Sequence, residues 1–186
     1  METERLIMRR WRSEDREPFA AMNADPEVME QFPATLSREQ SDAMVDRIES
    51  AFEEHGYGLW ALQVRATGEF VGFTGLAWQT FEARFTPALE IGWRLARAAW
   101  GHGYAGEAAA AAFEHGFGVG GLEEIVSLTA VSNLRSRAVM ERLGMVRDPA
   151  DDFDHPLLPE GHRLRPHVLY RLGRDAWRRG RGAVTR

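Results

Sequence analysis

The sequence predicts an α/β (α+β) protein with a mixed, mostly antiparallel sheet flanked by helices. Three strands, at 59–64, 70–76 and 88–95, follow one another with no helix between them, and this order is typical of an antiparallel meander. Apolar residues then recur at helical spacing over 103–117, before a further strand at 125–130. The switch from period two to period 3.6 places a helix directly after the meander.

The residues before the meander predict one strand and two helices. A strand is expected at 6–11, and Ser13, followed by acidic residues, predicts the cap of a helix through about Met22. Ser37 predicts the N-cap of a longer helix, which ends at Gly56.

The C-terminal third predicts a helix at 133–143, a final strand at 168–172 and a basic, flexible tail over about 178–186. No internal repeat or linker is evident in the sequence. We therefore expect a single domain over 1–186.

The composition excludes several classes of chemistry. The absence of cysteine excludes disulfides, thiolate zinc sites and a cysteine nucleophile, and no metal site is predicted. The absence of lysine excludes a Walker phosphate loop and a Schiff-base enzyme. A net charge of -5 disfavours nucleic acid as a partner, although the C-terminal arginines are a local exception.

The hydropathy pattern predicts a cytoplasmic protein that does not enter membranes. No apolar run reaches the roughly 18 residues that a membrane span needs. Residues 1–12 mix charges with apolar side chains and lack the continuous apolar core of a signal peptide.

The segment 90–108 reads as a strand, a glycine turn and the start of a helix. Backbone N–H groups at such a helix start point outward without partners, and the helix dipole adds partial positive charge. A diphosphate can bind there without a basic side chain. The alternative is a plain turn that uses glycine for tight geometry.

Gly101, Gly103 and Gly106 also satisfy G-x-G-x-x-G, with Glu123 and Glu124 near the place of a ribose-binding acid. This pattern makes a dinucleotide-binding oxidoreductase the main rival. The rival requires alternating strands and helices, and the meander disfavours it.

Two motifs in the right order resemble the GNAT N-acetyltransferases, specifically the RimJ/RimL-like branch, over nearly the whole chain. The family signature [Gln/Arg]-x-x-Gly-x-[Gly/Ala] corresponds to 100–105, with Trp100 at a position where the family has Gln or Arg. Gly106 stands where the family often has a hydroxyl residue. A second stretch, 133–145, resembles N-x-x-S-x-x-x-x-x-x-L-G-[Phe/Met].

The resemblance implies a sheet that splays where acetyl-CoA inserts, and it implies a set of cofactor-binding residues. The diphosphate is expected on the glycine turn, the pantetheine arm on the backbone of 93–95 and on Asn133, and the thioester sulfur near Ser136. Asn133 would also serve as a helix cap. The full set is Trp93, Arg94, Leu95, Gly101, His102, Gly103, Tyr104, Ala105, Gly106, Asn133 and Ser136.

Glu90 and Ser136 are the candidate catalytic residues. A carboxylate in a partly apolar cleft has a raised proton affinity, so Glu90 is a candidate general base, with pairing to an arginine as its alternative. Ser136 is the candidate acid for the leaving thiolate, ahead of Tyr104.

Three histidines, His155, His162 and His167, are expected in a loop that covers the acceptor and are secondary candidates for the base. The acidic segment 148–154 either attracts a cationic amine or is an ordinary solvated loop.

The partners expected from the resemblance are acetyl-CoA and a primary amine, either a protein N-terminus or a small molecule. A homodimer remains open. A catalytically weak module that senses acyl-CoA is the alternative function.

Overall fold

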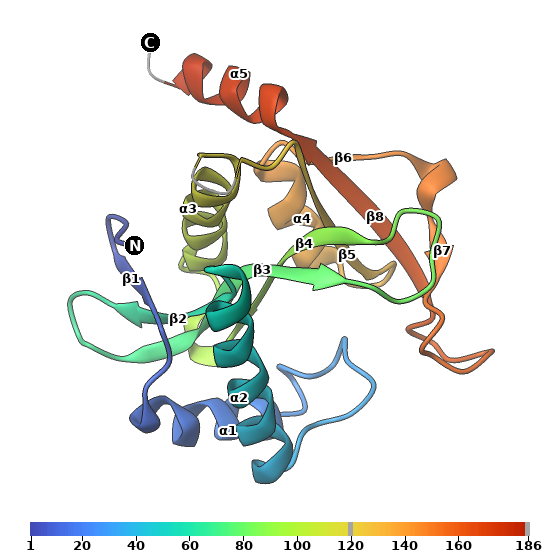
Figure 1. The fold of residues 1–186 in the computed structure, drawn as a ribbon. Coiled ribbons are helices and arrows are strands. Elements are labelled where there is room, and N and C mark those ends of the chain that lie inside the picture. Colours follow the sequence, from blue (N-terminus) through green and yellow to red (C-terminus); the bar gives the residue numbers. More distant parts are fainter. Residues whose placement is uncertain (119–120, 185–186) are drawn as a thin grey trace. The chain divides into compact units, whose positions relative to one another are not determined.

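The computed structural model describes residues 1–118 and 121–184, and these form two compact units. The units are the described parts of Met1–Ala77 with Gly92–Ala112, and of Trp78–Ile91 with Phe113–Arg186. Each unit boundary falls within an element of secondary structure: β3 (Phe70–Gln79), β4 (Ala88–Leu95) or α3 (Tyr104–Gly118). Figure 1 labels these elements.

The first unit contains the predicted meander. Strands β1 (Leu6–Arg9) and β2 (Leu59–Val64) are antiparallel, with Leu6 opposite Val64, and β2 is antiparallel to β3. Within this unit the strand order is β1-β2-β3-β4. β3 runs three residues beyond the predicted end at Leu76.

Helix α2 (Arg38–His55) has the ends that the sequence predicts. The Ser37 hydroxyl accepts the backbone N–H of Gln40, and the Gln40 side chain accepts the N–H of Ser37 at 2.8 Å, which completes a capping box. Gly56 ends the helix with a left-handed φ of 75°.

The expected cap at Ser13 is wrong. Helix α1 is Arg16–Ala24, preceded by a 3-10 turn at Ser13–Asp15. Asp15, which is 1% exposed, accepts the N–H of Arg12 at 2.8 Å and two hydrogen bonds from Arg9. A buried carboxylate that accepts three hydrogen bonds stabilises the local backbone more than a hydroxyl on the surface does.

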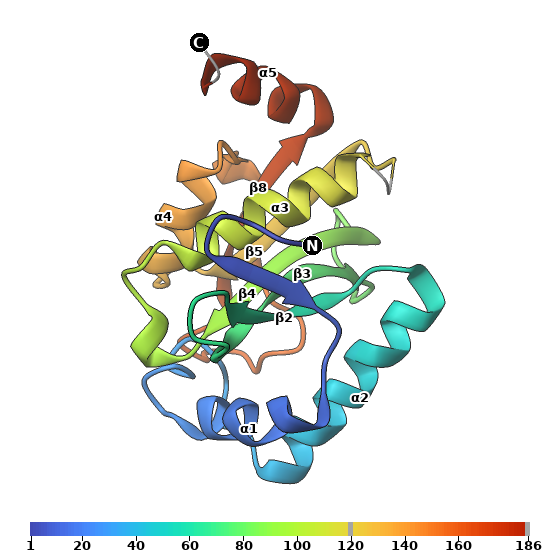
Figure 2. The same ribbon diagram turned by 90° about the vertical axis from the view of Figure 1, so that its left-hand side faces the viewer.

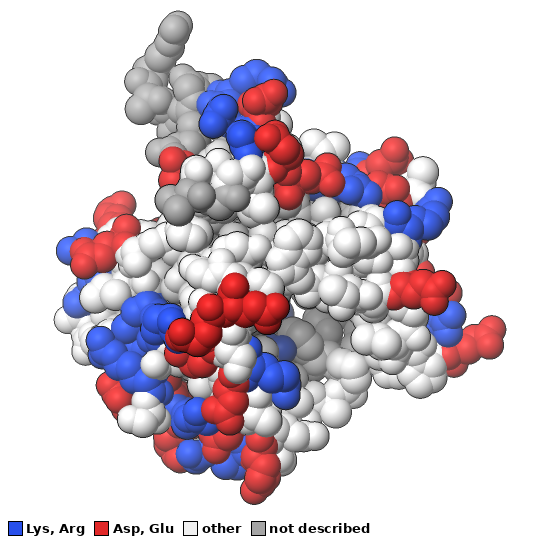
Figure 3. Space-filling view, in the orientation of Figure 1, with Lys and Arg blue, Asp and Glu red and all other residues white. Residues whose placement is uncertain are grey.

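Helices α1 and α2 lie side by side (Figure 2) and pack on the strands through aromatic rings. Phe19 of α1 contacts Trp11 at 4.7 Å and Phe73 of β3 at 6.0 Å between centroids. Phe52 of α2 packs edge-on against Trp60 of β2. Arginine and acidic side chains alternate over the outer faces of these helices, so no single sign of charge dominates there (Figure 3).

Replacing Gly72 with alanine is expected to lower the free energy of unfolding by about 3 kcal/mol. Gly72 has a φ of 136°, and a Cβ on it would meet the carbonyl oxygen of Arg94 and lie 2.8 Å from Leu95 Cα. Gly56→Ala is the matched control, since its Cβ would meet nothing within 4 Å and only its φ is strained; about 1 kcal/mol is expected. If urea unfolding gave equal losses of unfolding free energy for Gly72→Ala and Gly56→Ala, the close approach of β3 to β4 would be contradicted.

The second unit is built around β8 (Pro166–Gly173). β8 is antiparallel to β5 (Glu124–Ala130) along seven register pairs, and two-residue strands β6 (Val146–Arg147) and β7 (Phe153–Asp154) pair with it as well. β5 is parallel to β4. The predicted strands at 125–130 and 168–172 are confirmed, whereas β6 and β7 were not predicted.

Helix α4 (Leu134–Arg142) is confirmed, with Asn133 and Leu143 as its caps. Helix α5 (Arg174–Val184) covers part of the segment for which only a flexible tail was expected. Its Trp177 packs against Phe113 of α3 at 5.2 Å between ring centroids, which anchors the start of α5. Residues 185–186 of the expected tail lie outside the described residues.

The predicted mixed, mostly antiparallel α/β architecture is confirmed. β1 with β2, β2 with β3, and β8 with each of β5, β6 and β7 are antiparallel, and β4 with β5 is parallel. A dinucleotide-binding fold would need a predominantly parallel sheet. Among the described residues, no helix is long and apolar enough to span a membrane.

Candidate functional site

The glycine turn forms as the sequence predicts. Gly101 and Gly103 have φ values of 81° and 79°, the left-handed region that other residues adopt at a cost. Helix α3 starts directly afterwards at Tyr104. The Trp100 indole N–H donates to the carbonyl of Leu95 at 2.9 Å, which ties the turn back to the end of β4.

The backbone of this turn is open to a ligand. A Cβ added at Gly101 or Gly106 would meet nothing within 4 Å, and one at Gly103 would meet only the Arg5 guanidinium at 3.4 Å. The first amide hydrogens of a helix have no partner within it. Within the first unit, the turn therefore presents bare N–H groups and the positive end of a helix dipole to an anion.

Arg5 lies beside the turn and was not predicted. Its guanidinium donates to the carbonyl of His102 at 2.8 Å and pairs with Glu107 in the first turn of α3 at 2.7 Å. It also lies over the Tyr104 ring, which stacks on His102 at 5.4 Å. His102 and Tyr104 thus use their side chains to brace the turn, and their role toward the coenzyme would come from the backbone.

The end of β4 presents backbone groups from Gly92 to Leu95. The Thr74 hydroxyl donates to the carbonyl of Gly92 at 3.2 Å, and Leu95 accepts the Trp100 indole. The side chain of Arg94 points into the first unit and is 9% exposed. Of the three predicted pantetheine-binding residues here, Arg94 would therefore contact the pantetheine arm through its backbone only.

Glu90 lies in the second unit, on β4, opposite Val126 of β5. Its carboxylate accepts the Gln79 amide at 2.6 Å and the backbone N–H of Leu128. Burial raises the pKa of Glu90 to about 7, although both hydrogen bonds favour the charged form. No arginine is among the groups that shift this pKa, so the predicted alternative of pairing with an arginine is not supported.

Asn133 caps helix α4, as the sequence predicts. Its Oδ1 accepts the backbone N–H of Ser136 at 3.2 Å, and its Nδ2 donates to the Thr129 hydroxyl at 2.8 Å. Ser136 is half-buried in the first turn of the helix. Asn133 therefore fixes the position of Ser136 relative to the end of β5.

The three candidate histidines are not all in a loop. His167 is on β8, where its ring lies 4.8 Å from that of His155, and His162 is in a turn. Burial lowers the pKa values of His155 and His167, and the mutual repulsion of the two rings lowers that of His167 further. Burial therefore favours the neutral form of both rings. The expectation that His167 belongs to a loop is wrong, because it lies on β8.

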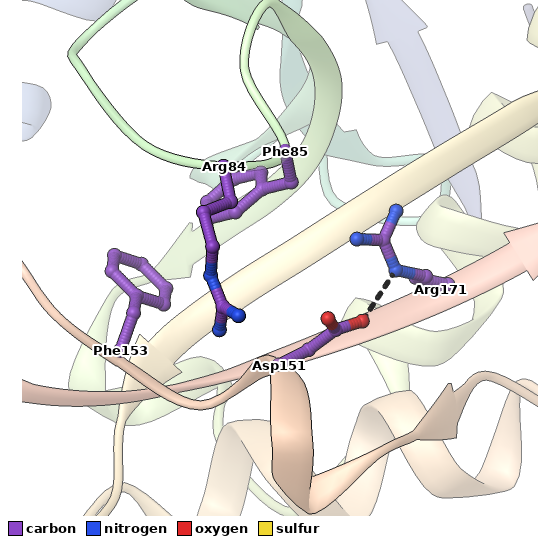
Figure 4. Close-up of a pocket in the computed structure, with 5 residues that line it drawn as sticks. All are labelled: Arg84, Phe85, Asp151, Phe153 and Arg171. Carbon is purple, nitrogen blue, oxygen red and sulfur yellow. Dashed lines mark hydrogen bonds and ion pairs between the residues drawn. The ribbon is translucent and has the colours of Figure 1, made fainter.

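A pocket of about 90 Å³ lies beside the acidic segment (Figure 4) and is lined by Arg84, Phe85, Asp151, Phe153 and Arg171. Asp151 pairs with Arg171 at 2.9 Å, as the dashed line shows. Asp154 pairs with Arg165, and Asp152 pairs with Arg147. These arginines offset the charge of the three carboxylates, which reduces the attraction of the segment for a cationic amine.

The residues that the structure describes contain no cluster of three or more histidine or acidic side chains that could hold a metal.

Comparison with known proteins agrees with this geometry. The model of the acetyltransferase (GNAT) domain matches residues 5–146. The FsC-acetyl coenzyme A-N(2)-transacetylase of Aspergillus fumigatus is 31% identical over 175 residues, which cover 89% of this chain and 72% of the relative.

Solved structures show the same fold. A GNAT-family acetyltransferase from Bacillus anthracis aligns with a TM-score of 0.77 at 24% identity, covering 94% of this chain and 98% of the other. Spermidine N-acetyltransferase from Vibrio cholerae, solved with CoA and spermine, aligns with a TM-score of 0.72 at 15% identity, covering 92% and 97%. The chain belongs to the GNAT family of acetyltransferases.

Proposed function

We propose that this acetyltransferase moves the acetyl group of acetyl-CoA to a primary amine by direct attack of the amine on the thioester. The observation that carries the proposal is the open glycine turn, with two left-handed glycines at the start of α3. A Cβ at Gly101 or Gly106 would meet no protein atom within 4 Å, so the space beside these amides is open to a diphosphate, which a side chain there would block. The A. fumigatus relative is named for transfer from acetyl coenzyme A.

The residues of the turn fit the diphosphate of the coenzyme. The N–H groups of 101–106 would bind its oxygens. Arg5, which is 46% exposed, lies adjacent to Gly103, and its charge is paired with that of Glu107. The backbone of 93–95 and the Asn133 side chain would hold the pantetheine arm. The coenzyme supplies an acetyl group activated as a thioester.

Glu90 is the proposed general base. A carboxyl with a pKa of about 7 is divided between its two protonation states at neutral pH, which suits it to accept a proton from an ammonium, directly or through a water. The Gln79 amide and the Leu128 N–H hold the carboxylate in place. The Ser136 hydroxyl is the proposed proton donor to the thiolate.

We further propose that the chain acts as one catalytic domain of the RimJ/RimL-like branch, whose members acetylate protein N-termini. The two motifs at 100–105 and 133–145 support this assignment. Small-molecule amines are the alternative acceptors.

Turnover of acetyl-CoA with a panel of amines tests the function. Thiol release that depends on the amine, with formation of the N-acetyl product by mass spectrometry, is expected for at least one acceptor. The panel contains peptides with free N-termini, amino acids and polyamines. Binding of acetyl-CoA without transfer to any of them would instead favour the sensor module.

A further inference from the structure

Arg94 is a buried cation at the end of β4. It is 9% exposed, and burial lowers the pKa of its guanidinium to about 10. A group with that pKa still carries its positive charge at pH 7. An arginine in such a place is costly unless its charge and its N–H groups find partners.

Among residues 1–118 and 121–184, no carboxylate pairs with the guanidinium of Arg94. Its Nη1 donates to the amide oxygen of Asn23 at 2.6 Å, and its buried Nε has no hydrogen-bond partner. Burial is the one cause found for the shift of its pKa, with no acidic side chain opposing it. The Asn23 oxygen is neutral and therefore satisfies one donor without neutralising the charge.

Arg9, in the same unit, shows how this protein pairs a buried arginine when the role is structural. The Arg9 side chain is 12% exposed, and it makes two hydrogen bonds to Asp15, at 2.6 and 2.8 Å. Arg9 thus donates from two nitrogens to one carboxylate, whereas no carboxylate of the described residues pairs with Arg94.

Aromatic rings hold the guanidinium of Arg94 flat. The centroid of Phe32 lies 3.9 Å from its central carbon and that of Phe73 lies 5.5 Å away. Cation–π contacts with these rings stabilise the positive charge, but they supply no hydrogen-bond acceptor to the Nε. Asn23 is itself fixed, because its Nδ2 donates to the buried Ser41 hydroxyl at 3.1 Å. The fork is therefore preorganised.

Phe32 belongs to the irregular segment between α1 and α2, and its side chain is half-buried. Access to the Nε of Arg94 requires this ring to shift, which a connecting segment permits more readily than a helix or strand does. Arg94 itself stands on β4, in the same unit as the glycine turn that is proposed to bind the coenzyme.

We propose that Arg94 binds a carboxylate of the acceptor, so that the acceptor is an amino acid or peptide that carries both an amine and a free carboxylate. A planar carboxylate matches the guanidinium fork and supplies the missing negative charge. The proposal rests on the proposed acetyl transfer and narrows its acceptor. A polyamine, which carries cations only, does not fit beside Arg94.

Binding of matched probes tests this site without turnover. Glycine, glutamate and the dipeptide Ala-Ala are titrated into the protein with bound CoA by calorimetry, each beside its carboxamide. At least one acid is expected to bind about tenfold or more tightly than its amide, and Arg94→Met should bring the ratio close to one. Arg38→Met, which removes an exposed arginine paired with Glu17 and Asp42, should keep the preference.

The results separate this inference from the proposed function. Equal affinity of acids and amides in the parent protein, or binding of neither, overturns the carboxylate site even if amines are acetylated. A preference for inorganic phosphate over every carboxylate overturns it as well. Selective binding of a carboxylate probe with no acetyl transfer supports the site and counts against the enzyme.

A structural role for Arg94 is checked in the same samples. If Arg94→Met does not fold, Arg94→Lys keeps the charge but loses the fork, and it should lower the acid-to-amide ratio while retaining the melting temperature more closely. If both Arg94→Met and Arg94→Lys still bind the acid more tightly than the amide by the parent's ratio, the proposal is contradicted. In the acetylation assay, the loss should fall on kcat/KM for acids and spare that for amides.

Discussion

Replacing Gly103 with aspartate is expected to abolish measurable binding of acetyl-CoA. The new carboxylate would stand at the start of α3, where the bare amides are proposed to meet a diphosphate, and the φ of 79° adds strain for any side chain. Loss of the amide contacts together with repulsion between anions should weaken affinity by about a hundredfold or more. Isothermal titration calorimetry measures the effect directly.

Two further variants separate charge from strain. Gly103→Asn adds a side chain of similar size without the charge and should weaken binding by less than Gly103→Asp. Gly56→Asp introduces the same residue at a φ of 75°, at the end of α2, with nothing within 4 Å of its Cβ. Unchanged affinity in Gly103→Asp would refute the diphosphate site, provided that Gly56→Asp also binds normally.

Replacing Glu90 with glutamine is expected to lower kcat/KM by about a hundredfold at pH values below the pKa of the acceptor amine, where a base must remove the proton. In the parent enzyme the rate should rise as pH passes through about 7, the pKa of Glu90, because the carboxylate form increases. This rise of the rate near pH 7 should be absent in Glu90→Gln. A variant whose pH profile matches that of the parent would dismiss Glu90 as the base.

The thermal stability of the parent and of Glu90→Gln tests the raised pKa of Glu90 without an activity assay. Because folding raises the pKa of Glu90 from 4.5 to about 7, the stabilising contribution of its protonated form is fully present below pH 4.5 and is lost as pH rises through about 7. Glutamine stays neutral at every pH. The melting temperature of Glu90→Gln, relative to that of the parent, should therefore be higher at pH 8 than at pH 4.5. A difference in melting temperature that is independent of pH would show that folding does not raise the pKa of Glu90.

The elements that local chemistry specifies were predictable from sequence. Ser37 and Gln40 close a capping box and Gly56 ends the same helix, all through contacts within a few residues. The glycine turn at 101–103 is also local, because positive φ values select glycine. Long-range pairing explains the failures. The cap at Ser13 was displaced by Asp15, whose position depends on Arg9 of β1, and two-residue strands such as β6 exist only because β8 lies beside them.

In the candidate site, too, local contacts were predictable from sequence and long-range contacts were not. Asn133 was correctly predicted as a cap, since its partner Ser136 is three residues away. Arg5 reaches the carbonyl of His102 across 97 residues, and no pattern near Arg5 indicates that contact. The side-chain environment of Arg94, which depends on Asn23, Phe32 and Phe73, was likewise not visible in a strand pattern.

Hydrogen–deuterium exchange over residues 99–108 tests the central claim most directly. CoA and pantetheine are compared at saturating concentration, because they share the thiol arm and differ in the diphosphate nucleotide. The account predicts that CoA slows exchange of the amides at the start of α3 and that pantetheine leaves them unchanged. Equal exchange with CoA and without any ligand would contradict it.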